Sequence, residues 1–123
     1  MTLTPSQKSK TNNFCVPYAL ALLTGKSIDD CVDLLKEKLG DQPIAGIFFP
    51  VARRILIEQG FECTDMGCVP GMWIGNYMLE IPGHMIVVSG GIIYDNGSHI
   101  NNRSAEILHP RMINRAIKVE KGA

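Results

Sequence analysis

The 123-residue sequence contains no long hydrophobic run, no surplus of charge of either sign and no C-x-x-C pair of cysteines. No window approaches the ~20 consecutive apolar residues that a membrane span needs. The first thirteen residues lack the apolar stretch of a signal peptide. Twelve basic residues balance twelve acidic ones, so the chain lacks the excess positive charge with which proteins bind nucleic acids or anionic membranes. We therefore expect a protein that is made and retained in a cytoplasm and binds neither nucleic acid nor membrane.

The four cysteines have no spacing that matches a zinc knuckle. The closest pair, Cys63 and Cys68, stands five residues apart, and Cys15 and Cys31 are isolated. In a chain without an export signal, thiols are expected to stay reduced. We therefore predict free cysteines, no metal site and no cofactor.

Length and composition predict one globular domain. The chain has 46% hydrophobic and 20% charged residues, which is typical of a folded protein rather than a disordered one. At this length, folding buries roughly two-thirds of the surface of the unfolded chain, enough for a core without disulfide bonds. No repeat, charge run or proline-rich linker divides the sequence. We predict a single domain over residues 1–123, in which residues 1–12 form a polar arm.

Three segments in the first half of the chain have the pattern of helices. Residues 14–25, FCVPYALALLTG, are apolar on most faces, as in a buried helix that ends at a glycine. Ser27, followed by two aspartates, predicts the N-cap of a second helix over 27–40, where apolar residues recur every three or four positions. A third helix is predicted over 48–59.

The second half of the chain predicts strands. Residues 61–66 read as a short strand, and the sequence HMIVVSGGIIYDNG, which begins at residue 84, predicts a hairpin around a Gly-Gly turn. Residues 112–119 predict a closing strand, whereas residues 72–80 predict a short helix or a loop. The fold class that follows is α+β, with N-terminal helices packed on a small antiparallel β-sheet.

Cys15 is the first candidate for chemistry because it stands where the first predicted helix begins. The positive end of the helix dipole and the free N–H groups of the first turn favour a thiolate, which is the nucleophilic form of cysteine. Alternatively, Cys15 is a small buried hydrophobic residue, because free cysteines are among the residues most often buried.

The predicted hairpin supplies an imidazole and a carboxylate. A two-residue turn at Gly90 and Gly91 places His84 and Asp95 on the same face of the hairpin as diagonal neighbours. A three-residue loop would instead place His84 opposite Asn96. We favour Asp95, because the two-residue Gly-Gly turn is the stronger hairpin signal. An imidazole held by either partner can accept a thiol proton and later return it to a leaving group.

These residues resemble a known family. Residues 15–20, CVPYAL, resemble the C-x-P-x-A-L helix start of the papain-like leader peptidases that process double-glycine bacteriocin precursors. Residues 83–88, GHMIVV, followed by Asp95, resemble the strand and downstream acidic residue of that family. The stretch CVPYALALLTGKS and the closing hairpin also resemble small uncharacterised bacteriophage proteins of the same fold.

The resemblance implies a papain-like fold and a cysteine hydrolase of the peptidase or amidase type. Cys15 would be the nucleophile, His84 the general base and acid, and Asp95 the residue that orients the imidazole. The family carries a glutamine about six residues before the cysteine as an oxyanion-hole donor, and this chain has Ser9 there. Asn13 and Gln7 are the candidate replacements, together with the backbone N–H groups at the cysteine.

Two other functions fit the same residues. A transferase would use the same three residues and differ only in the group that resolves the acyl-enzyme. A non-catalytic phage protein would reuse the papain-like fold to sequester a host factor or a small molecule. The expected partner is accordingly a peptide or protein substrate, or a host protein, and for a phage-encoded chain the compartment is the host cytoplasm.

The remaining candidates are aromatic and basic residues. Trp73 and Tyr77, which precede His84, could line the wall of a substrate cleft. The alternative is that they pack in the core, as aromatic residues more often do. Arg53 and Arg54 are expected on an exposed face of the third helix.

Overall fold

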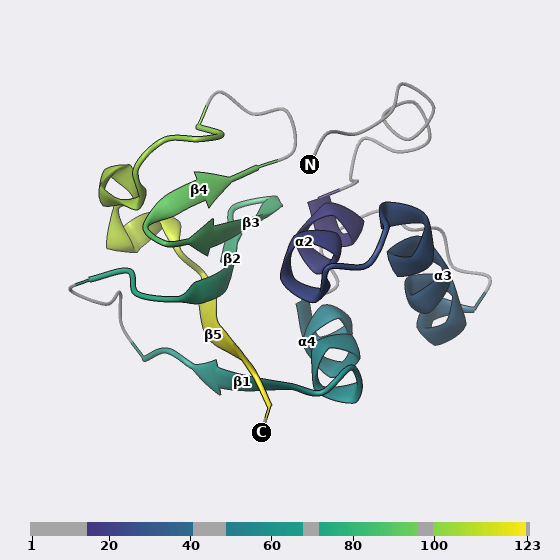
Figure 1. The fold of residues 1–123 in the computed structure, drawn as a ribbon. Coiled ribbons are helices and arrows are strands. Elements are labelled where there is room, and N and C mark those ends of the chain that lie inside the picture. The colour runs from purple at the N-terminus through teal and green to yellow at the C-terminus, as the bar shows by residue number, and fades with distance from the viewer. Residues whose placement is uncertain (1–14, 41–48, 68–71, 96–99, 123) are drawn as a thin grey trace.

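The protein is an α+β structure of three helices and a five-stranded antiparallel sheet in the part of the chain that is described (Figure 1). The computed structural model describes residues 15–40, 49–67, 72–95 and 100–122. The helices precede the strands, as the sequence predicted. The elements are α2 (Cys15–Thr24), α3 (Ile28–Leu39), α4 (Phe49–Glu58), β1 (Phe61–Asp65), β2 (Asn76–Ile81), β3 (His84–Ser89), β4 (Ile92–Tyr94), the 3-10 helices η1 (Ala105–Ile107) and η2 (Pro110–Met112), and β5 (Arg115–Lys121).

The three predicted helices are confirmed, with boundaries within one or two residues. The Ser27 side chain accepts a hydrogen bond of 3.1 Å from the backbone N–H of Asp30, so it caps α3 as predicted. The apolar stripe of α3 is turned inward, and its Cys31 and Leu35 are fully buried. Helix α2 buries almost its whole surface, which explains why its sequence is apolar on most faces.

The sheet has the strand order β1-β5-β2-β3-β4, so the last strand of the chain lies between the first two. Strand β5 pairs with β1 on one side, where Cys63 lies opposite Val119, and with β2 on the other, where Met78 lies opposite Ile117. The predicted closing strand is therefore confirmed, although it begins three residues later than residue 112 and lies inside the sheet.

The prediction of a short helix or loop over residues 72–80 is wrong for most of that segment. Residues 76–81 form β2, an interior strand paired with β5 and β3. Because Tyr77, Met78 and Leu79 are buried on both faces, the strand has no polar–apolar alternation from which it could be recognised. Its methionine, leucine and glutamate also favour helix, and pairing on both edges overrides that local preference.

The predicted hairpin is confirmed together with its register. Ser89 lies opposite Ile92, as a two-residue turn requires. Gly90 and Gly91 have φ angles of 58° and 79°, the pair of left-handed conformations that defines a type I′ turn. The alternative three-residue loop is thereby excluded.

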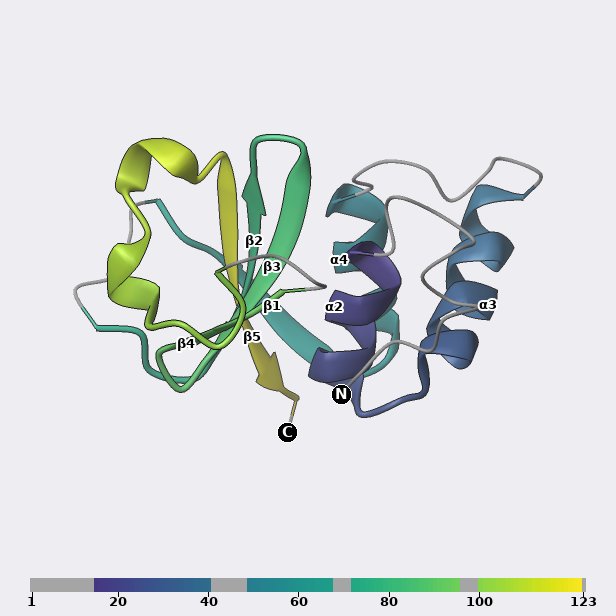
Figure 2. The ribbon, with the colours of Figure 1, turned by 90° about the horizontal axis from the view of Figure 1, so that it is seen from above.

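The helices and the sheet form two layers with a core on each face of the sheet (Figure 2). Helices α2 and α4 pack on one face, and α3 packs behind them, away from the sheet. The opposite face is covered by the segment that carries η1 and η2. Residues central to the helix-side core are Leu20, Leu56, Met78, Met85 and Ile117, and those central to the second core are Leu79, Ile86, Val88 and Ile93.

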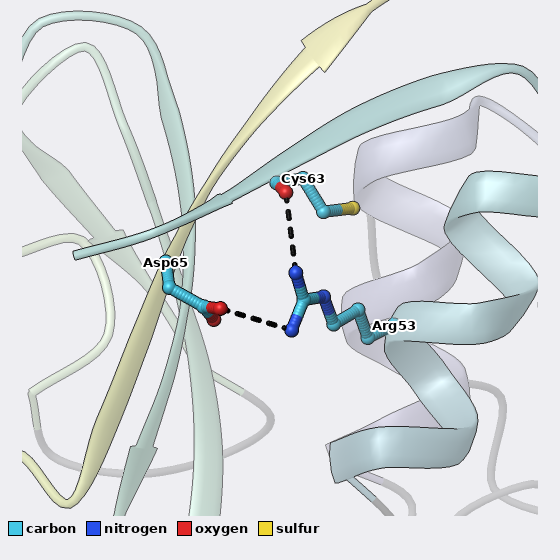
Figure 3. A network of polar contacts seen from close by, with 3 residues as sticks. All are labelled: Arg53, Cys63 and Asp65. Carbon is cyan, nitrogen blue, oxygen red and sulfur yellow. Dashed lines mark hydrogen bonds and ion pairs between the residues drawn. The ribbon is translucent and has the colours of Figure 1, made fainter.

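Arg53 ties α4 to the first strand of the sheet (Figure 3). Its guanidinium donates hydrogen bonds to a carboxylate oxygen of Asp65 at 3.1 Å and to the carbonyl oxygen of Cys63 at 3.4 Å. Both arginines were expected on an exposed face of α4. Arg54 is exposed, whereas Arg53 is half-buried between the layers. None of the described helices is both long and apolar enough to cross a membrane.

Candidate functional site

Cys15 is the first residue of α2. Its N–H has no partner within the helix, because the first four N–H groups of an α-helix never do. Its thiol is not in a disulfide bond, and the residue is 2% exposed, so the sulfur lies below the surface rather than on it. A nucleophile at this depth is reached only by a small reagent or a narrow extended substrate.

His84 is positioned by a tight turn and by the packing of α2. It is the first residue of β3 and lies opposite Ile81 of β2, across the two residues Pro82 and Gly83. Gly83 has a φ of 68°, as the third position of a type II turn requires. Helix α2 runs beside β3 (Figures 1 and 2), and this packing brings the first turn of α2 to the end of the strand that carries the imidazole.

Asp95 follows β4 and is hydrogen-bonded to His84. The bond joins Nε2 of His84 to Oδ1 of Asp95, across eleven residues of chain. The Asp95 side chain is fully buried and the His84 side chain is 30% exposed, so the imidazole bridges a buried carboxylate and the surface. Nδ1 is the ring nitrogen that this bond does not engage. The sequence predicted this pairing because the hairpin register follows from the Gly-Gly turn.

The electrostatics of the site favour a protonated imidazole. The hydrogen bond to Asp95 and, second, a hydrogen-bond interaction with Cys15 raise the pKa of His84 to about 10, although burial acts in the opposite direction. The effect of Cys15 on this pKa indicates that the thiol lies near the imidazole. A pKa of about 10 makes His84 an imidazolium at neutral pH, hydrogen-bonded to the carboxylate of Asp95.

The structure does not bring every predicted residue to this site. Gln7, Asn13 and Asn96 lie outside the described residues. Tyr77 is 3% exposed and belongs to the core on the face of the sheet opposite the helices, against which Trp73 packs with a ring-centroid separation of 5.0 Å. These two residues therefore pack in the core, which was the alternative to a cleft wall.

Two residues that the sequence reasoning did not connect with the site lie beside Asp95. The side-chain oxygen of Asn101 accepts a hydrogen bond of 2.9 Å from the backbone N–H of Asp95 and so helps to fix it. Tyr18 is buried one turn after Cys15, and its pKa is raised by burial and by the nearby Asp95 carboxylate. Tyr18 stands three residues after Cys15 on a predicted helix, so the two side chains lie on the same face. This spacing was the signal from which Tyr18 could have been connected with the site.

The other described cysteines do not share this environment. Burial raises the pKa of both Cys31 and Cys63. Among the described residues, no group of three His, Cys, Asp or Glu side chains is arranged to hold a metal ion.

The site holds an imidazole that is hydrogen-bonded to a buried carboxylate, with a thiol nearby. Groups of these types could chemically support covalent acyl transfer. Comparisons with models of protein families, with curated proteins and with solved structures found no match for this chain.

Proposed function

We propose that the chain is a papain-like cysteine hydrolase of the peptidase or amidase type. The observation that carries the proposal is the hydrogen bond between His84 and the buried carboxylate of Asp95, together with Cys15 of α2, which is near enough to His84 to raise the pKa of the imidazole. Nucleophile and base come from elements far apart in the sequence. A protonated imidazole is one of the neighbours that stabilise the thiolate of a nucleophilic cysteine.

In the reaction, the Cys15 thiolate attacks the carbonyl carbon of an amide, and the electron pair of the C=O bond moves to oxygen. Backbone N–H groups at the start of α2 are candidate donors to that oxyanion. The C–N bond then breaks as the His84 imidazolium gives its proton to the leaving amine. Water, deprotonated by His84, attacks the resulting thioester, and the thiolate leaves.

The causes of the His84 pKa suit this sequence of steps. Two of the contributions that raise the pKa come from Cys15, by hydrogen bonding and by charge. In the proposed mechanism, both are lost when the sulfur forms its bond to the carbonyl carbon. His84 therefore becomes a better proton donor at the stage at which the leaving amine needs a proton.

Alkylation with iodoacetamide at pH 6, followed by peptide-resolved mass spectrometry, tests the proposal. Cys15 should react much faster than Cys63, a half-buried thiol whose pKa is raised by burial. His84→Gln should abolish the difference, and Cys15→Ser should leave no fast site. If Cys15 reacts no faster than Cys63 in the unmodified chain, the hydrolase proposal is wrong.

The depth of Cys15 favours a second candidate function, a binding protein that uses the same fold without turnover. A sulfur in a residue only 2% exposed is poorly placed for large substrates. For a binding protein, Cys15→Ala would leave the biological effect intact. For a hydrolase, the same variant would abolish it.

A further inference from the structure

A cavity of about 690 Å³ lies between α4 and the sheet, at the end of β1 and the start of β5. Its walls combine apolar and basic side chains, including those of Phe49, Ile57, Met66, Arg53, Arg54 and Arg115. We call this cavity the α4 pocket.

The α4 pocket lies at the same end of the sheet as the imidazole. Arg115 of β5 pairs with Glu80 of β2, which pairs with Met85 of β3, the residue after His84. Neighbouring strands are ~4.8 Å apart, so the Arg115 backbone lies about 10 Å from that of Met85. The Arg115 guanidinium also lies over the ring of Phe49, 5.8 Å from its centroid, so it is on the side of the sheet that faces the helices.

A second cavity extends the α4 pocket around the start of β5. It has a volume of about 330 Å³ and shares Met66, Asn114, Arg115 and Ala116 with the first. The shared residues show that the two cavities adjoin at the start of β5. Adjoining cavities can take up neighbouring side chains of an extended peptide, whose residues are ~3.3 Å apart.

The charges in the α4 pocket leave arginine without a full acidic counterpart. Asp65 is already bound by Arg53 at 3.1 Å, and Glu58 by Lys38 at 2.6 Å. Arg54 is exposed and, within the described ranges, forms no ion pair. The ion pair of Arg115 with Glu80 joins Nε to Oε1 at 3.6 Å, a long contact, and the Arg115 side chain is 55% exposed, so its guanidinium is accessible and only weakly paired. Such groups suit a carboxylate, which a guanidinium can bind through two parallel hydrogen bonds.

We propose that the α4 pocket binds an acidic side chain of an extended peptide substrate, next to an apolar residue of the same peptide. Arg54 and Arg115 would bind the carboxylate, and Phe49, Ile57 and Met66 would contact the apolar neighbour. This proposal rests on the proposed hydrolase function.

Binding is tested on the full chain carrying Cys15→Ala, so that no turnover is needed. The probes are C-terminally amidated octapeptides of Gly and Ser with one adjacent Leu-Glu pair, and matched peptides with Leu-Gln. NMR titration of backbone amides should show shifts at Arg54, Arg115 and Ala116 with the acidic peptide. The Gln peptide should bind at least about tenfold more weakly, the change that corresponds to ~1.4 kcal/mol.

Variants separate the α4 pocket from non-specific charge effects. Arg54→Gln and Arg115→Gln should each remove most of the preference for the acidic peptide. Arg103→Gln, at an exposed arginine that lines neither cavity, should leave it unchanged. Equal binding of the two peptides, or no shifts at these amides, overturns the proposal. The outcome is independent of Cys15 alkylation in the unmodified chain, so failure of the pocket and failure of the hydrolase proposal are distinguishable.

Discussion

His84 is hydrogen-bonded through Nε2 to the carboxylate of Asp95, and this carboxylate is fully buried. The backbone N–H of Asp95 is held in turn by Asn101. Within the described part of the chain, Oδ2 of Asp95 has no hydrogen-bond partner, so the imidazolium is the group that compensates the buried charge. The pair thereby fixes the protonation state as well as the orientation of the imidazole.

The first prediction concerns this carboxylate. Asp95→Asn should lower the pKa of His84 from about 10 toward its ordinary value, because it removes the hydrogen bond to a charged acceptor. The change is measured by NMR titration of the imidazole protons. Iodoacetamide labelling of Cys15 at pH 6 should slow in the same variant. Glu106→Gln, at an exposed acidic residue of η1, is the control and should change neither quantity.

The second prediction is a pH dependence of stability. The pKa of His84 is about 10 in the folded state, above the ordinary value of 6.5 that applies when the chain is unfolded. Protonation of His84 therefore stabilises the fold fully below about pH 6.5, and this contribution is lost as the pH rises toward 10. The doubly substituted His84→Gln/Asp95→Asn protein lacks both charges. The free energy of unfolding, measured with urea, should exceed that of this variant in the unmodified protein, and the excess should fall from pH 6 to pH 10. Parallel curves would contradict the assigned pKa.

The third prediction concerns the turn that sets the hairpin register. Gly91 has a φ of 79°, and an added Cβ would lie 3.9 Å from its nearest neighbour, the carbonyl oxygen of Trp73. The cost of Gly91→Ala is therefore conformational rather than steric, about 1–2 kcal/mol for an L-residue in the left-handed region. Gly67→Ala, where φ is not positive and the space is open, should change stability by no more than about 0.5 kcal/mol. Urea unfolding measures both, and equal effects would argue against the type I′ turn.

The fourth prediction separates the two contacts of Arg53. Asp65→Asn should cost less than about 1 kcal/mol, because the Asp65 side chain is 70% exposed and solvent screens the ion pair. Arg53→Ala should cost more, since it also removes the hydrogen bond to the carbonyl of Cys63 and the packing of the arginine stem. Arg53 lowers the pKa of Cys63, so this variant should also slow alkylation of Cys63 at pH 8. Unchanged Cys63 labelling would contradict the contact.

Local signals in the sequence predicted most of the helices and the hairpin. The Ser27 cap and the apolar stripe of α3 are read within a few residues, and the Gly90–Gly91 turn fixes which residue faces His84. Strand β2 could not be predicted in this way. Its identity depends on partners on both sides, one of which comes from the end of the chain.

The residues of the candidate site also differ in whether local sequence signals could predict them. Cys15, His84 and Asp95 could be proposed because each belongs to a recognisable helix start or hairpin. Asn101 could not, because its contact with Asp95 depends on the path of a loop. The α4 pocket could not be predicted either. It forms where α4 and the start of β5 lie side by side, and hydrophobic periodicity does not indicate which elements become neighbours.

The interior position of β5, between β1 and β2, determines when the native sheet can form. A ribosome releases β1, β2, β3 and β4 before the strand that joins β1 to β2, so the sheet stays split during translation. Arg115 on this late strand completes the wall of the α4 pocket, so a nascent chain would lack that wall until β5 emerges. Binding in the α4 pocket would thus begin only after β5 has been synthesised and inserted.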